Sequence, residues 1–410
     1  MTKSCRGRAA AVCLTVVFVL ILCPFAANAT DLSPAKSEEK PSGKALPAPE
    51  ILSPYGVVLD ARTGAVIFEK NPHEKRPMAS TTKLMTAILA LETEDIGREV
   101  TVTNDMVVGN NDPSSVKLNL QPNDRITMHD LITAMMMLSA NDAAQSIAID
   151  MAGSFDAFAS RMNERAAELG MFNTHFVTPS GLHDPDHFST AYDMALLGIE
   201  AAKNPEMIYF TSATKRSIFF GSPTQNELVV TTRNDILPYR RFSKKEDKWT
   251  CDGLKTGYTG EAGYCFVSHT LRDDISLVCV TLDARSANEY FKDHRALYEY
   301  AYSHYINKGL TPTIEQPSIP VLGGAKPDAS VYVDGSGSVG VFDSQEGEIS
   351  KRVELAAYVE APVSKRQVVG HVRYYYGNAL LIEFPIRSGD NIDRADTNWV
   401  SAYAAMLGKV

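Results

Sequence analysis

A serine and a lysine stand three positions apart in the segment PMASTTKLM, at Ser80 and Lys83. Side chains at positions i and i+3 of a helix lie on one face, so the hydroxyl and the amine are expected to meet near a helix start. A neutral amine beside a serine can remove its proton and make it a nucleophile. Serine, threonine and proline are also ordinary helix-start residues, so the pair alone is more typical of a helix start than of catalysis.

Two later segments contain residues of a similar chemical kind. Ser139 and Asn141 interrupt a strongly helical region, where they either cap the second helix or supply a relaying hydroxyl and a peptide-binding amide. In DGLKTGYTGEAGY, Lys255, Thr256 and Gly257 stand where an expected strand enters a tight turn. A glycine there would let a substrate backbone approach closely. Taken alone, each segment is more typical of an ordinary helix cap or strand end.

The composition indicates an exported protein of two or three folded domains. The chain has 410 residues, of which 44% are hydrophobic. Residues 1–29 contain three basic residues, an apolar stretch and then Ala27-Asn28-Ala29, which is typical of a cleavable signal peptide. The alternative, an uncleaved membrane anchor, is less favoured because the apolar stretch is short. Loss of this segment changes the formal charge from −9 to −12, which argues against a nucleic-acid partner.

Three cysteines remain after the signal, at Cys251, Cys265 and Cys279. An odd number cannot all pair within one chain, and export normally leads to an oxidising compartment. They therefore form either one disulfide with one thiol or three buried thiols on neighbouring strands, and we favour the thiols. None has the close C-x-x-C spacing of a zinc site.

No metal or other cofactor is expected. His183 and His187 flank two aspartates in HDPDH, but Pro185 breaks the helix that would align them, so a metal site is not favoured. The stretch GSGSVG at 335–340 matches a dinucleotide-binding pattern, yet no helix is expected after it, and we interpret it as a loop.

The order of expected elements predicts an α+β catalytic unit. Residues 30–49, rich in Pro, Ser, Lys and Glu, are expected to form a flexible spacer. Within 50–308, a hairpin around residues 62–64 precedes helical patterning from about 80 to 203, further strands and a covering helix. This order favours helices packed on an antiparallel sheet over βαβ repeats.

The remainder of the chain is expected to form a second, smaller domain. A Pro-rich linker at 309–318 leads to an all-β domain at 319–390. Residues 391–410 place apolar side chains on one helical stripe. This tail is expected either to lie on a membrane surface or to pack on its own domain.

Together the three motifs resemble the S-x-x-K, S-x-N and K-T-G set of the penicillin-binding and serine β-lactamase superfamily. The sequence is most similar to low-molecular-weight penicillin-binding proteins that are D-alanyl-D-alanine carboxypeptidases. That similarity is carried by NTHF at 173–176, SGL at 180–182, STAYDMA at 189–195 and DGLKTGYTGEAGY at 252–264. It extends from about residue 51 through the second domain.

The resemblance implies a penicillin-binding fold and a peptidoglycan substrate. The expected reaction removes the terminal D-alanine from the stem pentapeptide through an acyl-enzyme, and β-lactam antibiotics are expected as covalent inhibitors. It also implies a location at the outer face of the bacterial cytoplasmic membrane or in the cell-wall space. The tail would be a peripheral membrane contact.

The resemblance also assigns roles to three catalytic residues. Ser80 would be the nucleophile and Lys83 its base. Burial and the charge of Lys255 should lower the pKa of Lys83, so that its amine is neutral. Ser139 would pass a proton to the leaving group.

A further set would bind the substrate. Asn141 would hold the acyl-side amide, and the backbone N–H groups of Ser80 and Tyr258 would form the oxyanion hole. Tyr258 stands where relatives carry histidine, so leaving-group contacts are expected to differ while the oxyanion hole does not. Arg285, with Lys255 and Thr256, would hold the terminal carboxylate. The substrate-binding residues implied are Asn141, Lys255, Thr256, Gly257, Tyr258 and Arg285.

Two alternatives share these motifs. A serine β-lactamase of class A would need a glutamate for deacylation, and no E-x-x-L-N occurs between Asn141 and Lys255. A catalytically inert peptidoglycan-binding relative would have no need of three intact motifs. A Ser-His-Asp hydrolase is not favoured, because the chain has no G-x-S-x-G and no histidine in a triad context.

Overall fold

The computed structural model describes residues 46–395 apart from residues 94, 108–114, 248 and 273–274. The expected signal peptide at 1–29, most of the spacer at 30–49 and most of the tail at 391–410 lie outside these residues. Those three assignments stay predictions. Among the described helices, none is both long and apolar enough to cross a membrane.

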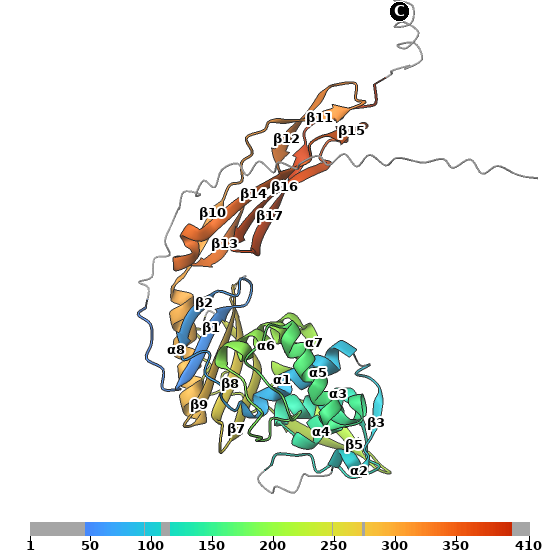
Figure 1. The fold of residues 1–410 in the computed structure, drawn as a ribbon, viewed down its shortest axis with the longest axis vertical. Helices are drawn as coiled ribbons and strands as arrows, with labels where there is room; N and C mark the ends of the chain where they lie inside the picture. The colour runs from blue at the N-terminus through green and yellow to red at the C-terminus, as the bar shows by residue number, and fades with distance from the viewer. Residues whose placement is uncertain (1–45, 94, 108–114, 248, 273–274, 396–410) are drawn as a thin grey trace, which may run out of the picture. The chain divides into compact units, whose positions relative to one another are not determined.

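A five-stranded antiparallel sheet forms the centre of the catalytic unit (Figure 1). The first two strands form the predicted hairpin around residues 62–64, and the last three form a meander that pairs back onto the first. The sheet order β2-β1-β9-β8-β7 therefore brings the two ends of the unit together. The strands are β1 (Tyr55–Asp60), β2 (Val66–Lys70), β7 (Thr250–Thr259), β8 (Gly263–Arg272) and β9 (Ile275–Ala284).

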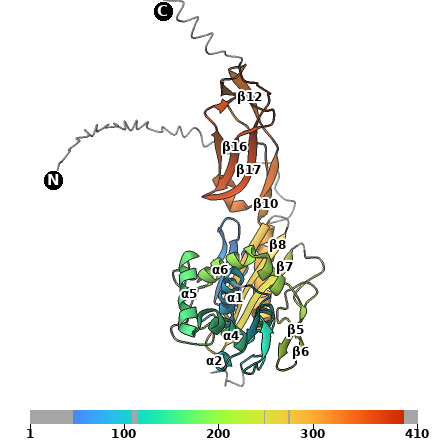
Figure 2. The same cartoon turned by 90° about the vertical axis from the view of Figure 1, so that its right-hand side faces the viewer.

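Helices cover both faces of this sheet (Figure 1), and Figure 2 is viewed from the side that carries most of them. Val57 and Leu59 of β1 join the core formed with the helices between α1 and α7, whereas Val58 joins the core under the final helix, α8 (Ala287–Ser303). Successive side chains of a strand point to opposite faces, so one strand contributes to both cores. The helices of the first face are α1 (Lys83–Thr93), α2 (Asn104–Val107), α3 (Met128–Thr133), α4 (Asn141–Ala152), α5 (Phe155–Glu168), α6 (Ala191–Lys203) and α7 (Pro205–Thr211).

Side-chain caps fix the starts of several helices. Thr190 accepts a hydrogen bond from the backbone N–H of Asp193 at the start of α6, and Ser286 does the same for Glu289 in α8. Each cap satisfies a backbone donor that has no partner within its helix. The same sheet-and-helix arrangement confirms the predicted α+β fold class.

A second sheet lies within the catalytic unit and is also antiparallel. Its order is β3-β4-β5-β6. The segments SIFFG and ELVVT belong to β5 and β6 of this sheet. Its strands are β3 (Glu99–Thr101), β4 (Arg125–Thr127), β5 (Lys215–Gly221) and β6 (Asn226–Thr231).

The C-terminal domain is built from strands around its own apolar core, as predicted. It contains a two-stranded and a six-stranded sheet. The glycine-rich stretch at 335–340 begins in a loop and runs into β13, with the short 3-10 helix η3 (Asp343–Glu348) after that strand. The strands are β10 (Tyr305–Leu310), β11 (Ser318–Leu322), β12 (Asp328–Val333), β13 (Gly337–Phe342), β14 (Ile349–Leu355), β15 (Val359–Glu360), β16 (Val368–Tyr376) and β17 (Ala379–Ser388).

Candidate active site

Lys83 and Ser80 meet at the start of α1, as their spacing predicts. Ser80 lies in the 3-10 turn η1 (Ala79–Thr82), and its Oγ is 2.8 Å from Nζ of Lys83. The same Nζ is 2.6 Å from Oδ1 of Asn141 and 2.6 Å from the backbone oxygen of Ser180. Lys83 is fully buried.

These three contacts match the hydrogen-bonding capacity of a neutral amine. The oxygens of Asn141 and Ser180 can only accept, so they take both N–H groups of an uncharged Lys83. Its lone pair is then left for the hydroxyl of Ser80. The Asn141 side chain is held in this orientation because its Nδ2 donates to Oγ of Ser115 at 2.5 Å. The arrangement therefore suits Lys83 to accept the proton of Ser80.

The electrostatic surroundings favour the same protonation state. Burial lowers the pKa of Lys83 well below its ordinary value of 10.5, and the charge of Lys255 lowers it further, while Asp142 opposes the shift. Among the described residues, no carboxylate forms a salt bridge with Lys83 or Lys255. The predicted direction and both of its causes are confirmed.

Ser139 and Lys255 form the second pair at the site. Nζ of Lys255 donates to Oγ of Ser139 at 3.1 Å and to the backbone oxygen of Thr256 at 2.8 Å. Burial, followed by the charge of Arg233, lowers the pKa of Lys255 to about 7. Ser139 is thus connected to a lysine that changes charge near neutral pH.

Three non-glycine residues at the motifs have left-handed backbone conformations. The φ angles are +49° at Ala79, +70° at Ser139 and +84° at Leu254. Such conformations are unfavourable for residues with a Cβ and cluster at functional sites. Ser139 also ends a π-helical segment, Ala134–Leu138, which is a further irregularity common at such sites. The strained residues place Ser80 and Ser139 and are not glycines, so the sequence carries no signal of them.

Two glycines let separate segments close on η1. A Cβ added to Gly257 would lie 2.9 Å from the backbone nitrogen of Ser80, and one added to Gly181 would lie 1.9 Å from the backbone oxygen of Ala79. We expected Gly257 to admit a substrate backbone, whereas the close approach seen here is to η1 of the same chain. Because Gly257 has no side chain, the backbone N–H of Ser80 can lie close to β7, at the residue that precedes Tyr258.

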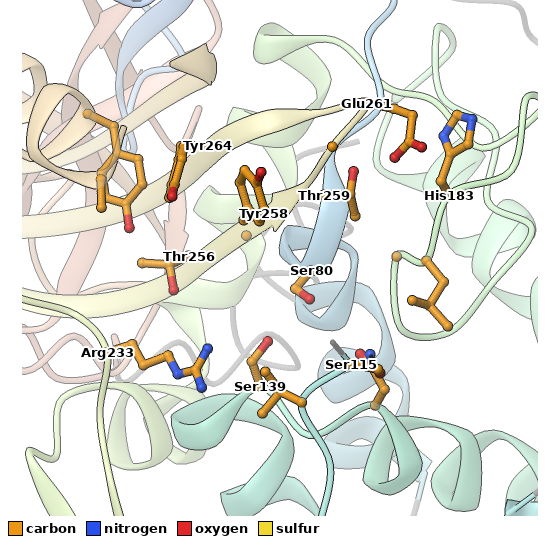
Figure 3. A pocket seen from close by; sticks show the side chains of 18 residues that line it. Ser80, Ser115, Ser139, His183, Arg233, Thr256, Tyr258, Thr259, Glu261 and Tyr264 are labelled. Atoms are coloured by element: carbon orange, nitrogen blue, oxygen red, sulfur yellow. Dashed lines mark hydrogen bonds between the residues drawn. The ribbon is translucent and has the colours of Figure 1, made fainter. Parts of the chain in front are cut away.

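A cavity of ≈630 Å³ opens above these groups, and Figure 3 shows the side chains around it. Tyr258 is more than half exposed, and its ring contacts the tilted ring of Tyr264, with 4.4 Å between ring centroids. Lys83 and Lys255 lie buried behind this surface rather than on it. Six of the nine predicted site residues line the cavity: Ser80, Ser139, Asn141, Thr256, Gly257 and Tyr258.

Arg285 is placed apart from this group. Its side chain is 76% exposed, forms a salt bridge with Glu289 at 3.0 Å and is not among the residues that line the cavity. Arg233, which the sequence reading did not single out, lines the cavity instead, near Thr256 in Figure 3. No hydrogen bond or ion pair joins Arg233 to another residue in the described part of the chain. It lies two residues after β6 and outside every motif, so only the folded structure brings it to the site.

The HDPDH segment supports η1. Nδ1 of His187 accepts hydrogen bonds from the backbone N–H groups of Val177 (2.9 Å) and Thr178 (3.2 Å), so its proton lies on Nε2. Nε2 is 2.8 Å from Oγ1 of Thr82, which donates to the oxygen of Ala79 at 2.8 Å. Burial lowers the pKa of His187 to about 4, so the ring is neutral. In the described ranges, no three His, Cys, Asp or Glu residues are grouped to hold a metal.

The three cysteines are buried free thiols. Cys251, Cys265 and Cys279 lie on β7, β8 and β9, the neighbouring strands on which we expected them. The preferred interpretation of the cysteines is confirmed.

Residues 42–286 match the family described as D-alanyl-D-alanine carboxypeptidase, Peptidase_S11. The chain belongs to this family. Residues 306–394 match a second family, described as the C-terminal domain of penicillin-binding protein 5. The family assignment and the penicillin-binding fold agree with the resemblance seen in the motifs.

Curated relatives include carboxypeptidases and an endopeptidase. D-alanyl-D-alanine carboxypeptidase DacF of Bacillus subtilis is 26% identical, over 83% of this chain and 85% of the relative. D-alanyl-D-alanine endopeptidase of Escherichia coli is 31% identical, over 60% of this chain and 76% of the relative. Among solved structures, penicillin-binding protein D2 of Listeria monocytogenes in its ampicillin-bound form is 29% identical with a TM-score of 0.53, over 62% of this chain and 100% of that chain.

Proposed function

We propose that this chain is a serine-type D-Ala-D-Ala carboxypeptidase that removes the terminal D-alanine of peptidoglycan stem pentapeptides. The observation that carries the proposal is the position of the buried Lys83 amine, 2.8 Å from the hydroxyl of Ser80. Among the described residues it has no carboxylate partner, and two other oxygens can accept its N–H groups. A hydroxyl becomes an effective nucleophile when a base of this kind removes its proton. Penicillin, which presents a strained amide to the same hydroxyl, is expected to acylate Ser80.

In acylation, Oγ of Ser80 bonds to the carbonyl carbon of the penultimate D-alanine, and its proton passes to Nζ of Lys83. The backbone N–H groups of Ser80 and Tyr258 stabilise the negative oxygen that forms. The C–N bond then breaks, and the proton held by Lys83 passes through Ser139 to the departing amine, which leaves Lys83 neutral again. Asn141 positions the substrate through its side-chain amide. Its Nδ2 releases Oγ of Ser115 and donates instead to a carbonyl oxygen of the substrate.

In deacylation, water attacks the ester on Ser80 and gives its proton to Lys83. The C–O bond breaks, the proton returns to Oγ of Ser80, and the shortened peptide leaves with a new carboxylate. The two half-reactions use the same base, so the loss of Lys83 affects both.

We assign the terminal carboxylate of the substrate to Arg233 and Thr256, with Lys255 beneath them. Arg233 faces the cavity and carries a charge without an ion pair among the described residues, whereas Arg285 is paired with Glu289. An unpaired guanidinium can form charge-assisted hydrogen bonds with a carboxylate without first breaking another contact. The earlier assignment to Arg285 is the alternative outcome of the test below.

The roles of Arg233 and Arg285 can be distinguished with one peptide in two forms, one with a free C-terminal carboxylate and one with an amidated C-terminus. Arg233→Ala should lower kcat/KM on the acid about ten- to a hundredfold, as expected for the loss of a charge-assisted hydrogen bond. Its effect on the amide should be small, because the partner charge is absent. Arg285→Ala should stay within about twofold of wild type on both. The reverse pattern would return the carboxylate to Arg285.

The reaction itself is tested by incubating the protein with a pentapeptide that ends in two D-alanines and measuring released D-alanine. Release without labelling by a tagged penicillin would contradict the shared acyl-enzyme. Rapid turnover of penicillin would favour a β-lactamase. Failure of both reactions in folded protein would favour an inert wall-binding relative.

We also propose that the chain is exported after cleavage near Ala29 and contacts the membrane through residues 391–410. The signal pattern and the apolar stripe of the tail support this location. The test is fractionation of cells that express the full chain or a chain lacking residues 393–410. Equal membrane recovery of the two processed proteins would exclude the tail as the contact.

A further inference from the structure

A buried carboxylate lies directly behind the Ser139-to-Asn141 motif. Asp142 is the second residue of α4 and is only 1% exposed. It follows Asn141, whose side chain contacts Lys83, but it has no role in the steps described above. Burying a carboxylate is unfavourable unless hydrogen bonds compensate, so the groups that Asp142 binds indicate its role.

Asp142 binds the backbone of a separate segment, residues 115–120, which we call the wall segment. Its Oδ1 accepts from the N–H of Leu118 at 2.9 Å, and its Oδ2 accepts from the N–H of Leu120 at 3.1 Å. A third donor, the N–H of Ala143 at 3.0 Å, belongs to the first turn of α4. The wall segment is neither helix nor strand, so Asp142 supplies acceptors that a sheet partner would otherwise provide.

The wall segment borders the cavity at its first two residues. Ser115 and Val116 line the cavity, and Figure 3 shows the side chain of Ser115. Asn141 binds both residues, because its Nδ2 donates to Oγ of Ser115 at 2.5 Å and its backbone N–H donates to the oxygen of Val116 at 2.8 Å. Asp142 binds the same segment two to four residues farther along. The course of the segment past Asn141 is therefore fixed at both of its ends.

Asp142 also acts on Lys83 through its charge. Burial and the charge of Lys255 lower the pKa of Lys83, and Asp142 is the carboxylate that opposes them. His187 also lies near Lys83, but its ring is neutral above its own pKa of about 4. Both oxygens of Asp142 are bonded to backbone N–H groups, so its charge acts on Lys83 through space. A negative charge in this position raises the pH at which the amine loses its proton.

We propose that Asp142 is a positioning residue of the active site, which holds the wall segment against Asn141 and sets the pH at which Lys83 begins to act as a base. It touches neither the substrate nor the reacting atoms and acts through these neighbours. The inference rests on the proposed carboxypeptidase function and deepens it. One carboxylate thus couples the substrate-binding amide to the base.

Two substitutions of Asp142 separate its charge from its hydrogen bonds. Asp142→Asn removes the charge and turns an NH2 group toward a backbone donor. It should lower the maximal kcat/KM about tenfold, mainly by raising KM, and should move the rising limb of the pH profile to lower pH. Asp142→Glu keeps the charge but displaces the oxygens. It should raise KM in the same way and leave the rising limb at the wild-type pH.

The measurements are D-alanine release from a peptide ending in two D-alanines and the rate of acylation by penicillin, each across pH. An unchanged KM in both variants would overturn the hold on the wall segment. A rising limb that stays in place in Asp142→Asn, or that is absent from folded wild type, would overturn the effect on Lys83.

Asp293→Asn is the matched control. Asp293 lies on α8, is 4% exposed and accepts from the backbone N–H groups of Leu52 at 3.0 Å and Ser53 at 2.7 Å. It is thus a buried helical carboxylate with the same kind of partners, and it does not line the cavity. Asp293→Asn should lower the melting temperature, keep KM within about twofold and leave the rising limb in place. An equal shift of the limb in this variant would attribute the effect to lost stability and overturn the proposal.

Hydrogen exchange tests the hold on the wall segment without a folded variant. In wild type, the backbone N–H groups of Leu118 and Leu120 should exchange at least about tenfold more slowly than unprotected amides. Fast exchange at both would overturn the proposal. If wild type neither releases D-alanine nor reacts with penicillin, the proposed function fails, while slow exchange at these two amides would still support the contact with Asp142.

Discussion

The catalytic unit buries ionisable groups in two places that behave differently. One is the pair Lys83 and Lys255 beneath the cavity, and the other is a cluster under α8 that contains His294, Ser268 and Tyr298. Burial lowers the pKa of Lys255 to about 7 and that of His294 to about 3. If a shifted pKa were the only criterion, both places would be candidate functional sites.

The lysine pair and the cluster under α8 differ in their hydrogen bonds. Under α8, Oγ of Ser268 contacts Nδ1 of His294 at 2.7 Å and the Tyr298 hydroxyl at 2.6 Å, and Nε2 of His294 contacts Oγ1 of Thr281 at 3.0 Å. Both ring nitrogens thus have partners inside the core, and none of these residues lines the cavity. At the site, each lysine instead adjoins a serine that faces the cavity. A buried base becomes a catalytic one when its partner is a nucleophile that a substrate can reach.

The largest contrast is expected between the two serines. Ser80→Ala should abolish both peptide hydrolysis and penicillin labelling, because the acyl group has no other acceptor in the mechanism. Ser268→Ala should retain both reactions and lower the melting temperature, since Nδ1 of His294 and the hydroxyl of Tyr298 lose their shared partner. The measurements are D-alanine release, adduct mass and thermal unfolding. An adduct on the Ser80→Ala protein would refute the assigned nucleophile.

The next contrast concerns the bases. Lys83→Met should lower kcat/KM about 10²- to 10⁴-fold, the usual contribution of general acid–base catalysis. Its unfolding free energy should change little, because the loss of three hydrogen bonds opposes the gain from replacing a buried amine that has no carboxylate partner among the described residues. Denaturant unfolding and steady-state kinetics measure the two quantities. A large loss of stability would mean that Lys83 supports the fold as well as the chemistry.

His294→Leu is the matched change under α8. It should keep kcat/KM near wild type and reduce the unfolding free energy by about 1–3 kcal/mol, because the hydroxyls of Ser268 and Thr281 lose a buried partner. The same two measurements apply. A loss of activity in a protein that unfolds normally would show that this cluster is coupled to the site.

The motifs anticipated that Ser80, Lys83, Ser139, Asn141 and Lys255 lie close together, because their spacing coincides with local helix and strand geometry. The position of Arg233 could not be predicted in the same way. It depends on where the connecting segment runs after β6 ends, and connections carry little periodic signal.

Local packing explains other differences between the sequence reading and the structure. Gly257 was expected to face a substrate, but its partner is η1, a contact that depends on how Ala79 and Gly181 pack. The three cysteines were easier to anticipate, since strand-like runs around each of them predicted burial on adjacent strands. Elements with a repeating pattern were therefore predictable, and contacts between irregular segments were not.

The pH dependence of activity tests the charge of Lys255. We expect kcat/KM to rise as Lys83 loses its proton and to fall as pH increases through about 7, where Lys255 loses the charge that favours an anionic substrate. Lys255→Arg should move the falling limb to higher pH, because arginine stays charged. Its maximum should be lower, since the planar guanidinium does not fit the contact with Ser139 equally well. A falling limb at the same pH in this variant would assign it to another group.

The pH dependence of stability also separates the two buried places. The pKa of Lys255 is about 7 when folded, against about 10.4 in an unfolded chain, so between these values the unfolded state binds more protons. Stability should therefore rise with pH in that window, by at most about 1.4 kcal/mol per pH unit for one lysine.

For His294 the same sign applies in an acid window, from about 3 to about 6.5, to which His187 with a pKa of about 4 also contributes. Denaturant unfolding at a series of pH values should show Lys255→Met flattening only the alkaline slope and His294→Leu reducing only the acid slope. Because each variant is compared with wild type, the many surface carboxylates that titrate in acid cancel from the difference. If Lys255→Met flattened the acid slope as well as the alkaline slope, the folded pKa of Lys255 would lie well below about 7, Lys255 would be neutral throughout the working range, and its role as a positive charge for the substrate would be lost.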